Sequence, residues 1–346
     1  MERVIKIMPK RIGFACKISE LDPKKGIVSI PEYNSRSTTV AWLNRQPKKD
    51  AVEKLWELMI HNIEAARRAV EYVGTFEESL KLFRLGSDIL PVYTQSDWSW
   101  FWREPDVRAY CEREFARVGH VARENNVRLS FHPGQFCVMA SDNPGIVDRS
   151  IEEFEYHADM ARWMGYGQTF QDFKCNVHIA GRLGAMGIVE AYKRLSPEAR
   201  NILTIENEEM KHGLDDCLVL TDYGIPIVLD VHHNWVREGE YITPMDPRCQ
   251  RILESWQGIR PVVHYSVSRE DYLVGHDATV APNYAELFET GHKKSKLRAH
   301  SDFYWNTACN DWVLEFLDTC DIMCESKSKN LASFALYERA KELGVV

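Results

Sequence analysis

The sequence lacks the long apolar segments that membrane and secreted proteins carry. No apolar run approaches the ~20 residues that a membrane-spanning helix needs. The start of the chain is basic, but Lys6, Pro9 and Lys10 interrupt its apolar residues, so the continuous apolar core of a signal peptide is missing. We therefore expect an intracellular, cytoplasmic protein with no membrane partner and no obligate protein partner.

Paired cysteines and an excess of positive charge are also missing. The nine cysteines are scattered, and the closest pair, Cys320 and Cys324, has neither a zinc-site nor a redox spacing. We therefore expect reduced thiols in the core rather than a disulfide framework. Lys and Arg number 43 against 51 Asp and Glu, which gives a net charge of −8. This balance argues against a generally basic nucleic-acid binder, although a carboxylate-rich site changes sign once it binds cations.

The chain does contain enough apolar material for a large core, in a regular alternation of patterns. Apolar residues make up 45% of its 346 residues, an ordinary globular value. Helix-period stretches occupy 50–73, 106–125, 144–166, 308–319 and 329–344. Eight short runs rich in β-branched residues indicate strands, several of them buried on both faces, at 11–16, 80–87, 127–133, 174–180, 202–208, 225–233, 260–266 and 320–326.

This alternation predicts an α/β fold, a (β/α)8 TIM barrel built by a single domain over residues 1–346. A doubly wound open sheet is the competing fold, and the count of eight strand runs favours the barrel. Three segments are long enough to be insertions between barrel elements, at 17–48, 90–105 and 267–299.

Histidines and carboxylates follow six successive strand runs near their ends. A barrel brings the carboxyl ends of its strands to one face, where active sites of this fold lie. A single such histidine would be interpreted as a hydrogen-bonded core residue, but six strands in succession make that interpretation poor. Buried unpaired carboxylates are costly, and cations would remove that cost. The side chains are His132, His178, Glu206, Asp230, His232, His233, His264 and Glu325, with His300 in the loop before the last strand.

These side chains predict a site for divalent metal ions. Imidazole and carboxylate together suit Zn²⁺, Mn²⁺ or Fe²⁺ better than a Ca²⁺ or Mg²⁺ cage. The set exceeds the coordination sphere of one ion, so two or three ions are expected, with a carboxylate such as Glu206 bridging. Metals ~3.5–4 Å apart assist phosphoryl transfer. The pattern points to metal-assisted hydrolysis and leaves a two-metal sugar isomerase or epimerase open.

Several motifs resemble the signatures of UV damage endonucleases. They are RLSFHPGQF (128–136), FRLGSDILP (83–91), DNPGIVDRSIEEFEYHADMARWMG (142–165), NVHIAG (176–181), TIENEE (204–209), LDVHH (229–233), VHYS (263–266), RAHSD (298–302) and MCESKSK (323–329). The resemblance spans roughly residues 11–345. It implies a TIM barrel that nicks double-stranded DNA on the 5′ side of pyrimidine dimers and 6-4 photoproducts, and also at abasic sites. It also implies two or three divalent ions, Mn²⁺ first and Zn²⁺, Co²⁺ or Mg²⁺ as alternatives, similar to trinuclear apurinic endonucleases.

The resemblance also implies a ligand set. His132 and His178 would share one ion with Glu206, and His233 and His300 would help to hold a third. The role of His232 stays open between orienting a ligand and facing the barrel wall. The second ion would be held by Glu206, Asp230, His264 and Glu325, and the catalytic group would be Glu206, Asp230, Glu325 and Lys327.

The same resemblance implies residues that contact the damaged DNA. Gln135 and Phe136 would enter the duplex at the lesion, where a planar side chain replaces lost stacking. Phe14 and Lys329 would also contact DNA, and Lys327 is the better candidate for a phosphate contact. The alternatives are ordinary loop packing for Phe136 and a solvated helix start for the lysines. The aromatic cluster at 98–102 could stack on bases, although such clusters more often pack a loop.

The chain departs from the family pattern at three positions. Phe14 stands where Tyr is common, Ile18 replaces an expected Asn, and Val262 replaces a Lys that can be carboxylated to bind metal. We therefore expect two well-held ions and a weak third site, unless the 267–299 segment supplies a ligand through His276, Asp277 or His292. A lesion-binding protein with reduced catalysis is the alternative outside enzymes.

Overall fold

Eight parallel strands form the sheet at the centre of the protein. The structure is a computed structural model that describes residues 9–346. Neighbouring strands run in the order β8-β7-β6-β5-β4-β1-β10-β9, with every neighbouring pair parallel. The strands are β1 (Ile12–Ala15), β4 (Leu82–Arg84), β5 (Arg128–Phe131), β6 (Lys174–His178), β7 (Leu203–Glu206), β8 (Ile227–Val228), β9 (Val262–Tyr265) and β10 (Asp321–Cys324).

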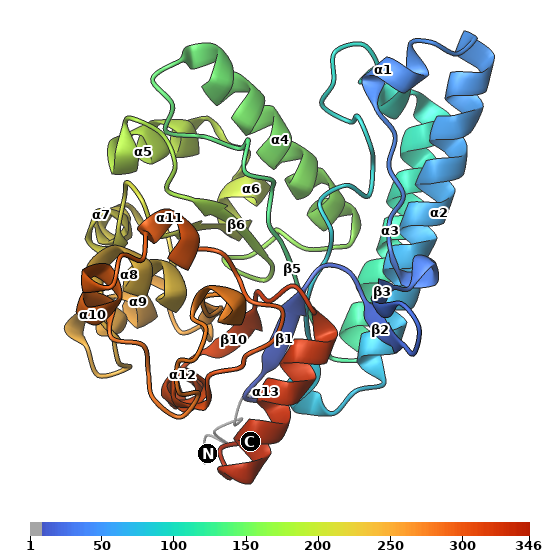
Figure 1. The fold of residues 1–346 in the computed structure, drawn as a ribbon. Helices are drawn as coiled ribbons and strands as arrows, with labels where there is room; N and C mark the ends of the chain where they lie inside the picture. Colours follow the sequence, from blue (N-terminus) through green and yellow to red (C-terminus); the bar gives the residue numbers. More distant parts are fainter. Residues whose placement is uncertain (1–8) are drawn as a thin grey trace, which may run out of the picture.

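The two end strands of this order meet just beyond β8. Asp230 forms a parallel bridge with His264, and the backbone N–H of His264 donates to the carbonyl of Leu229 over 2.8 Å. The sheet therefore curls into a nearly closed barrel with its helices outside (Figure 1). This confirms the TIM barrel, and the open doubly wound sheet is wrong.

The expected helices form within three residues of their predicted starts and ends, except that the helix expected over 308–319 finishes in a short 3-10 turn. Apolar residues at helical spacing bury one side of each long helix against the barrel. The long helices are α2 (Lys48–Gly74), α3 (Pro105–Glu124), α4 (Pro144–Trp163) and α13 (Asn330–Glu342). The shorter ones are α5 (Gly184–Arg194), α6 (Pro197–Ile202), α7 (Leu214–Leu218), α8 (Val231–Glu238), α9 (Pro247–Ser255) and α12 (Thr307–Leu314), with 3-10 turns η2 (Glu78–Leu80), η4 (Val219–Tyr223) and η6 (Glu315–Asp318).

The sixth strand is shorter than the sequence suggested. The run 225–233 predicts a strand that carries His232 and His233, but β8 ends at Val228 and α8 begins at Val231. The reason is Asp230, whose carboxylate accepts the backbone N–H of His233 over 2.7 Å and so caps the first turn of α8. Both histidines therefore lie on a helix rather than a strand.

The three predicted insertions contain the remaining elements. Residues 17–48 and 267–299 lie in loops that follow β1 and β9, and so they start at the carboxyl end of the barrel. In the 90–105 loop, Trp98, Phe101 and Trp102 are buried, so this cluster packs the loop. The elements are β2 (Ser19–Asp22), β3 (Gly26–Ser29), η1 (Pro31–Tyr33), α1 (Val40–Leu43), η3 (Phe101–Arg103), η5 (Glu270–Tyr272), α10 (Tyr284–Glu289) and α11 (Lys294–Leu297).

Close packing and buried thiols mark the core. A Cβ on Gly13 would lie 2.1 Å from the carbonyl oxygen of Leu82, so only glycine fits between β1 and β4 at this point. All nine cysteines are free thiols, and eight of them are buried. Among the helices of residues 9–346, none combines the length and the apolar character needed to cross a membrane.

Candidate metal centre

The predicted ligands converge at the carboxyl ends of the strands. His178 and Glu206 are the last residues of β6 and β7, and they are partners in the strand register. The others lie on or just beyond their strands, because a parallel barrel delivers every strand end to one mouth. They are His132 after β5, Asp230 after β8, His264 in β9 and Glu325 after β10.

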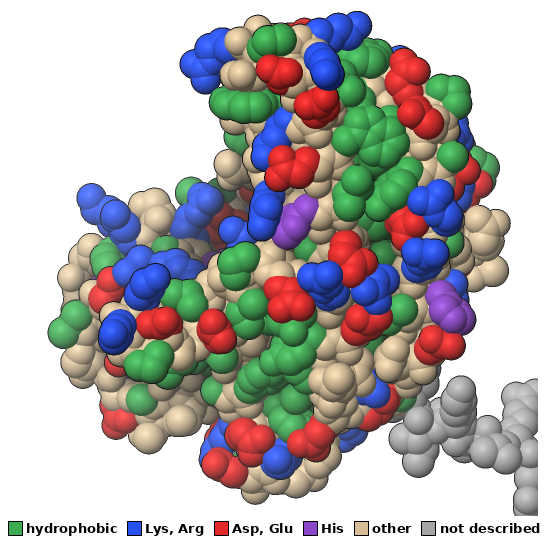
Figure 2. Space-filling view, turned by 90° about the vertical axis from the view of Figure 1, so that its right-hand side faces the viewer, with side chains coloured by type: hydrophobic (Ala, Val, Ile, Leu, Met, Phe, Trp, Pro, Cys, Tyr) green, Lys and Arg blue, Asp and Glu red, His purple; other side chains and the backbone are tan. Residues whose placement is uncertain are grey.

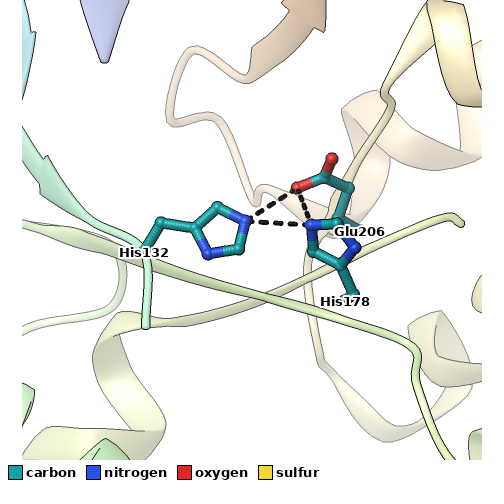
Figure 3. A group of neighbouring side chains, drawn as sticks. All are labelled: His132, His178 and Glu206. Carbon is teal, nitrogen blue, oxygen red and sulfur yellow. Dashed lines mark hydrogen bonds and ion pairs between the residues drawn. The ribbon is translucent and has the colours of Figure 1, made fainter. Parts of the chain in front are cut away.

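One group consists of His132, His178 and Glu206 (Figure 3). The Nε2 atoms of the two histidines are 3.1 Å apart. The Oε2 atom of Glu206 is 3.4 Å from Nε2 of His132 and 3.7 Å from Nε2 of His178. Three donor atoms from three adjacent strands therefore point at one place.

A second group shares the same glutamate. Glu206, Asp230, His264 and Glu325 bring one donor atom each within 4.8 Å of one another. Nδ1 of His264 lies 3.0 Å from Oε2 of Glu206 and 3.2 Å from Oε1 of Glu325. Glu206 therefore belongs to both groups.

Backbone carbonyls fix the orientation of three histidine rings. The Nδ1 atoms of His132, His233 and His300 lie 2.8, 3.0 and 2.6 Å from the carbonyl oxygens of Pro133, Asn207 and Glu325. A proton on Nδ1 donates to such a carbonyl and leaves the lone pair on Nε2 for a metal. The rings are thus held in a ligating orientation by the main chain.

Unpartnered buried atoms show that the centre suits divalent cations. Oε1 of Glu206, Oδ2 of Asp230 and Nδ1 of His264 are buried without a hydrogen-bond partner. All three residues are 0% exposed. Buried carboxylate oxygens without a hydrogen bond are costly, and coordination to a divalent ion would satisfy them.

Burial controls the protonation of the centre. It raises the pKa of Asp230 well above its usual value, helped by the nearby Glu206 carboxylate. Burial lowers the pKa of His264 to about 4, so this ring is neutral near pH 7. Burial would also lower the pKa of His233, but Asp230 and Glu206 outweigh it and raise that pKa to about 9. The carboxylates of Asp230 and Glu206 therefore favour a positive charge at His233.

Three further polar residues support the ligands, and the sequence interpretation did not include them. Arg84, at the end of β4, forms an ion pair with Glu325, and Asn176 donates to Oε2 of Glu206. Lys174, at the start of β6, lies with Nζ 2.9 Å from Nε2 of His264, and burial lowers its pKa to about 7. The sequence did carry a signal for two of them. Side chains alternate between the two faces of a strand, so residues 174 and 176 share a face with the predicted ligand at 178.

The candidate DNA-contacting residues differ in their exposure to solvent. Phe136 is 85% exposed beside the exposed Gln135, and Lys327 is exposed with its Nζ atom 3.7 Å from Oδ1 of Asp302. Lys329 is half-buried in a left-handed backbone conformation with φ 55°. Phe14 is 1% exposed and packs against Phe83, so its expected contact with DNA is corrected to a core role.

The remaining candidates lie outside both ligand groups. His232 stacks on Trp235, with ring centroids 5.9 Å apart. Val262 is buried and offers no ligand atom. In the inserted segment, His276 bonds the carbonyl of Val280, Asp277 caps the backbone at Thr279, and His292 bonds carbonyls of Leu287 and Tyr272. These three do not fill the place of the missing lysine.

Comparison with known proteins shows which family the chain resembles. The profile of the family described as UV-endonuclease UvdE matches residues 10–346. A UV DNA damage endonuclease from Bacillus cereus is 25% identical over 319 residues, which cover 88% of each chain. A UV-damage endonuclease from Schizosaccharomyces pombe is 26% identical over 341 residues, covering 95% of this chain and 50% of the relative.

Solved structures share the fold. The crystal structure of SacUVDE superimposes with a TM-score of 0.70 at 20% identity and covers 97% of this chain and 99% of that one. Endonuclease IV from Thermus thermophilus gives a TM-score of 0.52 at 14% identity and covers 80% of this chain and 93% of that one. Because the profile match runs from residue 10 to the last residue, the chain belongs to the UV-endonuclease UvdE family.

Proposed function

We propose that the protein is a metal-dependent DNA repair endonuclease that hydrolyses the phosphodiester on the 5′ side of UV photoproducts in double-stranded DNA. The observation that carries the proposal is the pair of ligand groups that share Glu206 at the barrel mouth. The relatives named as UV DNA damage endonucleases support the same activity. Action on DNA also implies an intracellular location.

The residues of the mouth have separate roles in this proposal. His132, His178 and Glu206 hold one divalent cation, and Asp230, His264 and Glu325 hold a second together with Glu206. Such ions supply a Lewis acid, which activates water and neutralises charge on the phosphate. Mn²⁺ is the ion we propose first, with Zn²⁺, Co²⁺ or Mg²⁺ as alternatives. Arg84 and Lys174 hold Glu325 and His264 in place.

The surface around the mouth suits a DNA duplex. Figure 2 shows the molecule hollowed between two lobes, with Lys and Arg side chains gathered along the rim of one of them. Positive side chains on a rim attract phosphates over several base pairs. In this proposal Lys327 contacts a phosphate, and Gln135 and Phe136 enter the base stack at the lesion; the exposure of all three side chains supports these roles.

A nicking assay tests the proposal. Irradiated and unirradiated plasmid are incubated with the chelated protein and with the protein reloaded with Mn²⁺. Nicks only in irradiated plasmid with Mn²⁺, mapped to the 5′ side of dimers, are the expected result. Plasmid with abasic sites shows whether these are cut as well.

Two other functions make different predictions in the same assay. A lesion-binding protein would shift irradiated DNA without nicking it under any metal condition. A sugar isomerase or epimerase would do neither, and the family match does not favour it. Absence of metal-dependent nicking of irradiated plasmid would overturn the proposed function.

A further inference from the structure

A polar cavity of about 280 Å³ lies at the end of the barrel opposite the candidate metal centre. Arg128 and Lys174, the first residues of β5 and β6, line it together with Arg11, which directly precedes β1. In a parallel barrel the strand starts meet at the other end from the strand ends. The cavity is therefore separate from the mouth, and the proposed function does not use it.

Arginine charge exceeds carboxylate charge around this cavity. Asp321 is 1% exposed and pairs with two guanidinium groups, through Oδ2 with Arg128 and through Oδ1 with Arg260, each over 2.7 Å. One carboxylate therefore balances only one of these two arginines. Arg11 pairs with Glu78 over 2.7 Å, so this network keeps the positive charge of one arginine.

A further arginine lies at the rim of the cavity. Arg123 is exposed, and its described contacts are the carbonyl of Met164, 2.8 Å away, and the ring of Tyr166. Neither of these partners is an anion. The carboxylate of Asp172 lines the cavity as well, and it accepts backbone N–H groups of residues 167–169. The four arginines and three carboxylates of this group leave a net positive charge, which favours an anion.

Two buried atoms of residues that line the cavity have no hydrogen-bond partner, and one is a donor and the other an acceptor. The donor is Nε of Arg11, which is 6% exposed, and the acceptor is Oε1 of Gln171, which is 5% exposed. Nε2 of Gln171 donates to the carbonyls of Asn201 and Leu203 over 3.0 and 2.9 Å, which fixes the orientation of the amide. A bound group that both accepts and donates would satisfy the two atoms.

We propose that this cavity binds a small oxyanion that carries a hydroxyl group, of which hydrogenphosphate is the simplest. Its charged oxygens accept from the guanidinium groups of Arg11, Arg123 and Arg128, because planar N–H groups suit oxyanions. Its hydroxyl donates to Oε1 of Gln171. The inference goes beyond the proposed function, because it concerns anion binding at the opposite end of the barrel and holds whether or not damaged DNA is cut.

The acceptor in the wall gives the site a selectivity that can be measured. At about pH 8, sulfate and methyl phosphate carry the same charge as hydrogenphosphate but no hydroxyl. They would leave the amide oxygen of Gln171 buried and unpaired, which weakens binding. The comparison also separates free phosphate from a phosphate monoester as the source of the anion.

Calorimetric titration of the full chain tests the site without an activity assay. The protein is stripped with a chelator and desalted, so that phosphate cannot bind at the mouth through a metal ion, and sodium chloride keeps the ionic strength constant. One phosphate per chain should bind, and sulfate and methyl phosphate should each bind at least about tenfold more weakly. No binding of phosphate, or equal affinity for the three anions, would overturn the proposal.

Two variants test the residues of the cavity. Gln171→Met keeps the length of the side chain and removes its amide, so phosphate should lose its advantage over sulfate, and circular dichroism checks that the variant folds. Arg123→Gln changes an exposed side chain and keeps the test decisive if Gln171→Met folds poorly. It should weaken phosphate and sulfate alike by about tenfold and leave the preference for phosphate.

Arg117→Gln is the matched control for the second variant. Arg117 is an exposed arginine of the same helix, α3, and pairs with Glu114 rather than lining the cavity, so this variant should bind phosphate like the wild type. Unchanged phosphate affinity in Arg123→Gln, or an unchanged preference for phosphate in folded Gln171→Met, would show that the anion does not bind as proposed.

Discussion

At the scale of single residues, Glu206 is the side chain on which the centre depends most. It is fully buried at the end of β7, and it contributes to both ligand groups. Asp230 has a double role, because one carboxylate oxygen caps α8 and the other is buried without a hydrogen-bond partner. A change that keeps the size of these side chains and removes their charge should therefore act on metal binding more than on folding.

Glu206→Gln and Asp230→Asn should each lower nicking of irradiated DNA by several orders of magnitude, because each deletes an anionic ligand. Initial nicking rates with Mn²⁺ measure the effect, and circular dichroism checks that the barrel still forms. Glu208→Gln is the control and should nick like the wild type, because Glu208 belongs to neither ligand group and accepts backbone N–H groups of Lys211 and His212. If either variant kept more than about a tenth of the wild-type rate, its assignment as a ligand would be wrong.

Gln135→Ala combined with Phe136→Ala should weaken discrimination between damaged and intact DNA, with metal content unchanged. Stacking a side chain on exposed bases is worth ~1–3 kcal/mol, or roughly 5–150-fold in binding. The ratio of cleavage rates on irradiated and unirradiated duplexes measures it. Val274→Ala, which trims another strongly exposed apolar residue, is the control. Equal discrimination by the double variant and the parent would refute the probe role.

At the scale of elements, the alternation of strands and helices could be predicted because each strand run is buried and each long helix has one apolar side. The end of β8 could not be predicted in the same way. Residues 225–229 are apolar, and only the fold shows that Asp230 caps a helix there. The family resemblance predicted that Phe14 contacts DNA, but the ring is buried in the core.

The convergence of the two candidate ligand groups could be predicted from the sequence, because their residues lie at the ends of consecutive strands. The groups that support them could not, because it depends on the folded barrel whether Arg84, Asn176 and Lys174 reach the candidate ligands. A buried lysine or arginine looks like a surface residue in a sequence, since such side chains are mostly exposed.

Gly13→Ala should destabilise the barrel where β1 meets β4. The added Cβ would lie 2.1 Å from the Leu82 carbonyl oxygen, and backbone cannot give way cheaply, so we expect a loss of about 3 kcal/mol or more. The midpoint of urea unfolding measures it. In Gly145→Ala the new Cβ stays at least 3.4 Å from other atoms, so this control should unfold like the wild type. Equal midpoints would contradict the close packing described for β1.

At the scale of the whole molecule, buried histidines link stability to pH. His157 of α4 is 0% exposed, and burial lowers its pKa from 6.5 to about 4. Between these values the unfolded chain protonates this histidine and the folded protein does not. The unfolded state then binds more protons, so stability is full above about pH 6.5 and falls as the pH drops towards 4.

For His157 this effect amounts to about 3 kcal/mol. Urea unfolding of the metal-free protein at a series of pH values from 7 to 4.5 should therefore give falling midpoints, and His157→Phe, which keeps a ring of similar size and cannot be protonated, should show a weaker fall. His120→Phe is the control, because His120 is exposed, and it should keep the wild-type dependence. An identical pH dependence for His157→Phe and the wild type would rule out this linkage.

The polar side chains that support the candidate ligands have a consequence for the protein when it holds no metal. Arg84 and Lys174 give Glu325 and His264 partners that belong to the chain itself. Loss of the ions therefore leaves these ligands with internal partners, and unfolding need not follow. In a cell short of metal, the protein would then stay folded but inactive. When metal returned, repair capacity could recover within the time of ion binding rather than the time of new protein synthesis.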